Sequence, residues 1–362
     1  MQKSSMSIQA WTYPDKNYDA SPEIADGRRI DVLKPQYYTL GDNGMLQLMT
    51  SGYNAYNATN VALVKQHSSQ QFVMISGNTT GISTLTASQQ LTTAFINIIT
   101  SFLFTNNFTG AELDFEGFAD WTPTQYNNYK AFVKSLGSAL HTKGYKLMID
   151  GPAISDKEYQ GYYPQWNYSD FDNIPQVDYI VAMAYDYDFD QGAGSAIAPL
   201  SWLGDICQWM LSNISDHSRI VVAINSYGYH EKLGIYNNVV EDTYQQSMQF
   251  QGFNTATRDA SSGEMTWTNA GIFYNYSDQT TIQGKVNVVL NAGLNAVSIW
   301  HLGGGNPFPA QLPQPTPVPT PTPSPVPTPQ PTSLTLTLDQ LKAITGVLSS
   351  DQISTIKNII GQ

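Results

Sequence analysis

Short apolar runs recur along most of this chain, and segments with helical spacing separate them. The intervening segments 88–104, 122–144 and 281–293 carry apolar residues at helical spacing, and the last two end in glycine, as helices often do. Strand-like runs that alternate with helices predict a parallel sheet. The runs are 7–11, 36–40, 71–77, 110–116, 146–151, 178–186, 219–225 and 295–300.

Eight such units within about 300 residues predict an α/β fold of the (β/α)8 TIM-barrel type. An open, doubly wound sheet is the alternative fold. Neither G-x-G-x-x-G nor G-x-x-x-x-G-K-[ST] follows an early run, which weighs against the nucleotide-binding version of that alternative.

A proline-rich stretch divides the chain. Every second residue from Pro313 to Pro331 is proline. Proline lacks the N–H that helices and sheets need and favours extended geometry in the residue before it, so this stretch predicts a polyproline II spacer. We therefore expect a barrel domain over residues 1–308, a Pro/Thr-rich linker over 309–332 and a small helical segment over 333–362.

The C-terminal segment carries two helix-start patterns, Thr337-x-x-Gln340 and Ser349-x-x-Gln352, each followed by apolar residues at helical spacing. This arrangement predicts a short helical hairpin. Because about 30 residues rarely make a core of their own, we expect residues 333–362 to contact the barrel, a second copy of the chain or a partner.

Composition excludes several classes of partner and cofactor. The net charge is −12 with 17 Lys and Arg, and these do not cluster, so nucleic acids and anionic membranes are not expected to bind. No run approaches the length of a membrane span, and the N-terminus lacks the apolar segment of a secretory signal. A single cysteine, Cys207, and the absence of paired Cys/His motifs give no reason to expect a metal or another cofactor.

The run at 110–116 is acidic at every second position, because Glu112, Asp114 and Glu116 alternate with Ala111, Leu113 and Phe115. In a strand the three acids share one face. In a barrel that face points inward and ends at the C-terminal rim, where barrel enzymes act. Carboxylates held close together raise one another's pKa and share protons, which suits a general acid. The alternative is an edge strand with a solvated acidic face.

Several segments together resemble one family. Residues 109–116, T-G-A-E-L-D-F-E, resemble the DGxDxDxE signature of glycoside hydrolase family 18, which includes chitinases and endo-β-N-acetylglucosaminidases. Residues 178–186 resemble that family's sixth strand with its M-x-Y-D ending, and residues 285–300 resemble its last helix and strand, which end in tryptophan. Shorter likenesses at 198–200 and 226–228 extend the resemblance over roughly residues 7–305.

The resemblance implies a role for each matching residue. Glu116 would protonate the glycosidic oxygen, Asp114 would orient the substrate's 2-acetamido group, and Tyr185 would donate to the acetamido oxygen. Glu112 stands where the family has aspartate, which puts the reaction rate in question. The supporting and sugar-contacting positions would be Glu112, Met183, Asp186, Tyr13, Tyr227 and Trp300.

The resemblance also implies a mechanism and a substrate. The acetamido carbonyl would attack C1, and the anomeric configuration would be retained. The expected substrate is a β-1,4-linked N-acetylglucosamine polysaccharide, with neutral chitin favoured over peptidoglycan by the low positive charge. An N-glycan core is a further candidate. A non-catalytic sugar-binding relative and a barrel enzyme of another class are the alternatives, and Glu116 weighs against the first.

Two further expectations concern location and cleft shape. Such a substrate implies an extracellular, particle-associated or wall-associated place of action, although no signal peptide is visible. Only about 70 residues separate the seventh and eighth runs, so we expect no full additional domain there and an open cleft.

Overall fold

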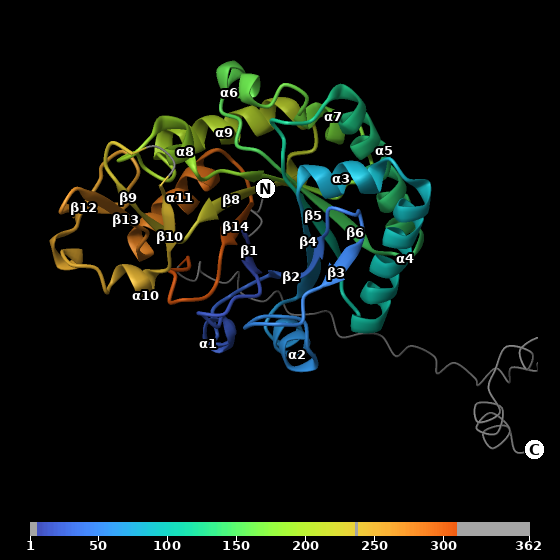
Figure 1. The fold of residues 1–362 in the computed structure, drawn as a ribbon, viewed down its shortest axis with the longest axis horizontal. Coiled ribbons are helices and arrows are strands. Elements are labelled where there is room, and N and C mark those ends of the chain that lie inside the picture. The colour runs from blue at the N-terminus through green and yellow to red at the C-terminus, as the bar shows by residue number, and fades with distance from the viewer. Residues whose placement is uncertain (1–5, 236–237, 310–362) are drawn as a thin grey trace, which may run out of the picture. The chain divides into compact units, whose positions relative to one another are not determined.

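Eight parallel strands close into a barrel in the computed structural model, which describes residues 6–235 and 238–309. The ring closes because β1 pairs with both β14 and β2, and helices surround it (Figure 1). This confirms the predicted (β/α)8 barrel. The barrel strands are β1 (Ser7–Thr12), β2 (Val32–Leu40), β4 (Gln70–Gly77), β5 (Gly110–Phe115), β6 (Lys146–Gly151), β7 (Tyr179–Met183), β8 (Ile220–Asn225) and β14 (Ala296–Trp300).

The helices follow the strands in the order that the sequence predicts. α4 and α5 match predicted segments, and α5 begins with a capping box between Thr122 and Gln125. Gly144 and Gly293 adopt positive φ after α5 and α11, in agreement with the predicted glycine ends. The helices are α1 (Ser21–Ala25), α2 (Ala58–Gln66), α3 (Thr79–Thr86), α4 (Gln89–Asn106), α5 (Pro123–Thr142), α6 (Lys157–Tyr162), α7 (Tyr168–Asp172), α8 (Tyr187–Gln191), α9 (Leu200–Asn213), α10 (Tyr244–Ser247) and α11 (Gln279–Asn291), with short 3-10 turns at His217–Arg219 and Phe253–Thr255.

A small antiparallel sheet, formed by the chain segment that follows β8 and precedes α11, lies beside the barrel (Figure 1). The sequence led us to expect no full additional domain here, and the segment instead holds a compact five-stranded sheet in the order β10-β9-β13-β12-β11. Its strands are too short to stand out as apolar runs. They are β9 (Gly228–Lys232), β10 (Val240–Asp242), β11 (Thr257–Arg258), β12 (Met265–Asn269) and β13 (Ile272–Tyr276), while β3 (Leu46–Leu48) is an antiparallel addition to β2.

Strand β5 shows how the alternating pattern is used. Its apolar residues Ala111, Leu113 and Phe115 are fully buried in the layer between the strands and the helices, where Phe115 stacks on Phe132 of α5. The alternate residues therefore face the barrel interior, as the pattern predicted.

Strand β2 begins at Val32 rather than at residue 36, where the predicted run starts. Lys34 and Pro35 interrupt the apolar pattern there, yet Lys34 is completely buried. This correction matters for the site described below.

The predicted linker and hairpin lie outside the described residues, apart from Pro309 at the start of the linker. Among the described residues, no helix has both the length and the apolar character needed to cross a bilayer.

Candidate active site

The acidic face of β5 points into the barrel and ends at its mouth. Glu112 is 0% exposed and Asp114 is 8% exposed, whereas Glu116, the residue after the strand, opens to solvent. The Glu116 amide donates to the Gly77 carbonyl at 3.1 Å, which continues the strand pairing to this residue. Gly117 then turns the chain with φ of +101°, a conformation that favours glycine. The backbone on both sides of Glu116 is therefore well defined.

Glu112 has partners that the sequence did not indicate. Its Oε1 accepts from the Lys34 ammonium at 2.6 Å, and its Oε2 accepts from Trp11 Nε1 at 2.9 Å. Lys34 also lies over the Trp11 ring, 3.3 Å from the centroid. A buried lysine, which the sequence did not indicate, thus balances the charge of one of the three acids.

The remaining two acids of the motif act as a pair. Burial, together with Glu116 and Glu112, raises the pKa of Asp114 well above its usual range. Nearby protein atoms also raise the pKa of Glu116, although part of its side chain opens to solvent. Neighbouring carboxyls whose pKa values are both raised can share one proton instead of both ionising. The pair can therefore supply a proton at the barrel mouth.

A fourth carboxyl, Asp150 of β6, also lies inside the barrel and was missed by the sequence analysis. It is 1% exposed, and burial raises its pKa well above the usual range. Its position was readable from strand parity, since Asp150 stands two residues after Met148, whose side chain packs inside the barrel. A single Asp at the end of an apolar run gave no sign of chemistry on its own.

Two candidate residues follow β7. Tyr185 is half-buried and lines the site, while Asp186 adopts positive φ of 68°. The Asp186 carboxylate accepts hydrogen bonds from the hydroxyls of Tyr227, at 2.5 Å, and Tyr229. Burial raises the pKa of Asp186 to about 6, and the two tyrosine hydroxyls limit this rise. Tyr229 was missed by the sequence analysis.

Tyr227 is more deeply buried than a residue that contacts a sugar needs to be. It is 1% exposed, and its hydroxyl is engaged by Asp186. The geometry fits a role in holding Asp186, and the predicted sugar contact of Tyr227 stays a prediction.

Two adjoining pockets meet at these residues. The inner pocket has a volume of about 110 Å³ and is lined by Trp11, Met74, Asp114, Glu116, Asp150, Met183, Tyr185, Asp186 and Trp300. The outer pocket, of about 370 Å³, is lined by Glu116, Phe118, Pro152, Ala153, Tyr163, Met183, Tyr185, Asp186, Phe189 and Asp190. Glu116 borders both pockets, so its proton is available to a bond that spans them.

Trp11 and Trp300 line the inner pocket, and Tyr13, which is outside that lining, packs against Trp300. Trp300 meets Trp11 edge to face at 5.7 Å between centroids. Tyr13 lies parallel to Trp300, 5.4 Å away and at an interplanar angle of 5°. Flat apolar rings of this kind suit the C–H face of a sugar.

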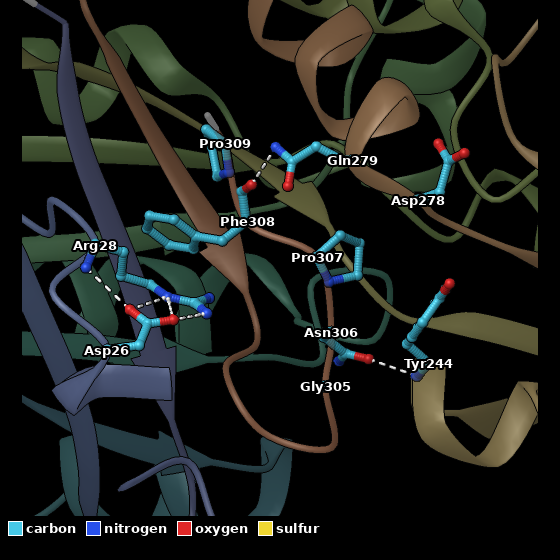
Figure 2. A pocket seen from close by; sticks show the side chains of 10 residues that line it. All are labelled: Asp26, Arg28, Tyr244, Asp278, Gln279, Gly305, Asn306, Pro307, Phe308 and Pro309. Atoms are coloured by element: carbon cyan, nitrogen blue, oxygen red, sulfur yellow. Dashed lines mark hydrogen bonds and ion pairs between the residues drawn. The ribbon is translucent and has the colours of Figure 1, made fainter. Parts of the chain in front are cut away.

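A larger pocket, of about 420 Å³, is formed in part by residues 305–309 that follow β14 (Figure 2). Figure 2 shows Asp26 paired with Arg28 and Gln279 donating to the Phe308 carbonyl. Its other carboxylate, Asp278, pairs with Arg258 at 2.6 Å. Because both carboxylates are engaged by arginine, this pocket lacks the proton-holding acids of the barrel mouth.

Across residues 6–235 and 238–309, no group of three or more His, Cys, Asp or Glu side chains is arranged to hold a metal ion.

Stability is expected to fall as pH rises through neutrality, with Asp188 as a main contributor. Asp188 is 1% exposed beside Glu231, and burial raises its pKa to about 7. A carboxyl with a raised pKa in the fold stabilises it fully below the unfolded-state pKa of about 4, and that stabilisation is lost as pH rises through about 7. Asp188→Asn should therefore raise the free energy of unfolding by on the order of 2 kcal/mol at about pH 8 and change it little at about pH 4.

Thermal unfolding of the wild type and Asp188→Asn at the two pH values tests this expectation. Asp120→Asn, at an exposed site, is the control. An equal effect of Asp188→Asn at both pH values would contradict it.

Comparisons with known proteins agree with this architecture. A family model described as glycosyl hydrolases family 18 matches residues 12–305. The cortical fragment-lytic enzyme of Bacillus subtilis (strain 168) is 24% identical over 194 residues, which cover 50% of this chain and 44% of that enzyme. The Bacillus anthracis enzyme of the same name is 24% identical over 217 residues, covering 54% and 46% respectively. The match thus spans less than half the length of these curated relatives.

Solved structures share the fold. The Bacillus cereus spore cortex-lytic enzyme SleL superposes with a TM-score of 0.70 at 19% identity, covering 85% of this chain and 73% of that one. A class V chitinase from Pseudomonas fluorescens Pf-5 gives a TM-score of 0.68 at 20% identity, covering 84% and 96%. At these identities the likeness shows the fold.

Proposed function

Because the chain belongs to glycosyl hydrolase family 18, we propose that it cleaves β-1,4-linked N-acetylglucosamine polymers by a retaining, substrate-assisted reaction. The observation that carries the proposal is the inner pocket, where Asp114, Glu116, Tyr185 and Trp300 line one space of about 110 Å³. A pocket of this size suits one acetamido group with part of its sugar ring.

The proposed reaction begins with the proton that Asp114 and Glu116 share. Glu116 donates it to the glycosidic oxygen as the bond from C1 to that oxygen breaks. The acetamido carbonyl oxygen attacks C1 from the opposite side and forms an oxazolinium ion. Asp114 accepts a hydrogen bond from the acetamido N–H, and its negative charge stabilises the cation.

The second half of the reaction reverses the proton transfer. Water attacks C1, Glu116 accepts its proton, and the ring of the oxazolinium opens to regenerate the acetamide. Tyr185, whose pKa is raised well above its usual range by burial, stays protonated and donates to the acetamido oxygen. Each attack inverts C1, and the water enters from the face that the leaving glycosidic oxygen vacated, so the two inversions retain the configuration.

Chitin is the first choice of substrate, and peptidoglycan is the second. The net charge of −12 does not favour retention on an anionic wall. The names of the curated relatives, cortical fragment-lytic enzymes, favour the peptidoglycan alternative. An N-glycan core is the third substrate candidate, and a sugar-binding protein without activity is the remaining alternative.

Product analysis on chitin oligomers and purified peptidoglycan, side by side, tests the proposal. We expect N-acetylglucosamine oligomers to be shortened, with the β-anomer appearing first by NMR. Cleavage of peptidoglycan alone would move the assignment to the second substrate. Binding of both glycans without cleavage of either would indicate that the protein is a lectin and not an enzyme.

A further inference from the structure

The buried Lys34–Glu112 pair takes no part in the reaction proposed above, yet it lies directly beneath the reacting acids. Both side chains are 0% exposed. Besides Glu112, Lys34 Nζ contacts the Trp11 ring at 3.3 Å and Met148 Sδ at 3.7 Å. A buried ammonium with one anionic neighbour at 2.6 Å is an ion pair, and removing either partner leaves an uncompensated charge.

The length of Glu112 explains why this position holds glutamate. Its carboxylate reaches Trp11 of β1 and Lys34 of β2, so one oxygen binds each. Both oxygens are thereby engaged away from Asp114. In contrast, Asp114 Oδ1 has no hydrogen-bond partner among the described residues. The mobile proton therefore has Glu116, and not Glu112, as its second site.

Asp150 completes the arrangement on the other side of Glu112. Neither of its oxygens accepts a hydrogen bond from a donor within the described ranges. A buried carboxylate without a donor is costly, and burial together with nearby Glu112 raises the pKa of Asp150 well above its usual range. We therefore expect Asp150 to hold a proton of its own, while Glu112 carries the charge that balances Lys34.

Resting on the proposed function, we propose that Lys34 is a positioning residue for catalysis. It pairs with Glu112, Asp150 keeps a proton of its own, and the one mobile proton is confined to Asp114 and Glu116. The substrate then meets Asp114 and Glu116 with one negative charge between them, and proton transfer from Glu116 leaves the Asp114 carboxylate beside the oxazolinium ion.

Other ionisable groups act on the same pair of acids from the surrounding elements. These groups are unchanged in the variants described below. They therefore affect the pH profiles of wild type and variants alike and do not account for a difference between them. They are Tyr129 on α5, Tyr163 after α6, and Tyr185 and Asp186 after β7.

The test is the pH profile of kcat/KM on a soluble chitotrioside. Its alkaline limb reports loss of the mobile proton. Lys34→Met removes a nearby cation, so the proton is held more tightly, and the limb should move up by about one pH unit with at least a tenfold loss at the optimum. Glu112→Gln removes a nearby anion and should move the limb down.

The double variant Lys34→Met/Glu112→Gln separates charge from packing. It removes both charges together, so its alkaline limb should return to the wild-type position and its activity should recover to within about threefold. Because a neutral pair is easier to bury than a lone charge, this variant remains informative if Lys34→Met does not fold. A limb that stays at the wild-type pH in both single variants would overturn the proposal.

A second buried pair provides the matched control. Lys285 and Glu264 are also 0% exposed and 2.9 Å apart, but neither lines the two pockets. Lys285→Met/Glu264→Gln should alter thermal stability without moving the alkaline limb. Displacement of the limb by this control would show that any buried pair has the same effect, and the special role of Lys34 would be lost.

The protonation of Asp150 can be measured without substrate. Infrared spectra show a C=O stretch for protonated carboxyls, and Asp150→Asn should remove one such band at neutral pH. Asp150→Asn, which keeps the shape and neutrality of a protonated carboxyl, should lose less activity than Asp150→Ala. An unchanged carboxyl band in Asp150→Asn would overturn the assignment of its proton.

These readouts distinguish the two proposals. If wild type fails to cleave any N-acetylglucosamine polymer, the proposed function fails while the infrared result still decides the charge arrangement. If wild type is active but Lys34→Met, Glu112→Gln and the double variant all share its pH profile, the proposed role of Lys34 fails and the proposed function stands.

Discussion

Glu116→Gln is expected to lower kcat on a chitotrioside by about 10³–10⁴-fold, the largest effect of any single substitution in this chain. Glutamine has nearly the same shape as glutamic acid but cannot donate an acidic proton to the leaving oxygen or accept one from water. Both halves of the proposed reaction lose their proton transfer. Steady-state kinetics with a chromogenic chitotrioside measures the loss.

Binding should survive this substitution, which allows chemistry to be separated from affinity. Glu116 opens to the cleft, and its backbone is held by Gly77 and the turn at Gly117. Calorimetric titration with chitotriose should therefore give a Kd within about threefold of wild type. Glu158→Gln, on the first turn of α6 and outside both pockets, is the control for the change of charge. Retention of more than a tenth of the activity in Glu116→Gln would refute its assignment as the acid.

The parts of the fold that sequence revealed are those encoded by local periodicity. Alternation along β5 places Glu112, Asp114 and Glu116 on one side and three buried apolar residues on the other. The order of apolar runs and helices specifies the barrel, since each unit is read from its own residues. The tyrosine and aspartate after β7 were instead indicated by the resemblance of residues 178–186 to the family's M-x-Y-D strand ending.

The parts that sequence did not reveal depend on contacts between distant segments. Lys34 and Glu112 are 78 residues apart in sequence, and only barrel closure brings them within 2.6 Å. A lysine beside a proline is typical of a loop, so the first residues of β2 were left out of the predicted strand. Asp150 has the same difficulty, because a lone acid in an apolar run becomes informative only beside another acid.

The two tyrosines behind Asp186 illustrate a related limit. Tyr229 belongs to β9 of the small sheet, whose strands of two to five residues carry too weak a pattern to predict. Yet this sheet supplies a hydroxyl that fixes a residue lining both pockets. The small sheet therefore contributes to the order of the site.

Removing the acetamido group from the sugar on the C1 side of the cleaved bond is expected to lower kcat/KM by at least about 10³-fold. An internal nucleophile replaces a bimolecular attack, and well-oriented intramolecular groups have effective molarities of about 10⁵–10⁸ M, so its loss is severe. In the inner pocket no residue is expected to substitute for it, since Asp114 is proposed to bind the N–H and Glu116 to carry the proton. Matched chromogenic disaccharides with a 2-acetamido, 2-amino or 2-hydroxyl group measure the effect.

Asp114→Asn makes this comparison specific to substrate assistance. On the 2-acetamido substrate it should cost about 10²–10³-fold, because the oxazolinium ion loses its anionic partner. On the 2-hydroxyl substrate it should change the residual rate little, since no such cation forms. If wild type cleaves the 2-hydroxyl substrate at a comparable rate, or if NMR shows inversion at C1, a protein carboxylate or a bound water must supply the nucleophile. Asp150 and Asp186, the other two carboxyls that line the inner pocket, would then be the first residues to replace.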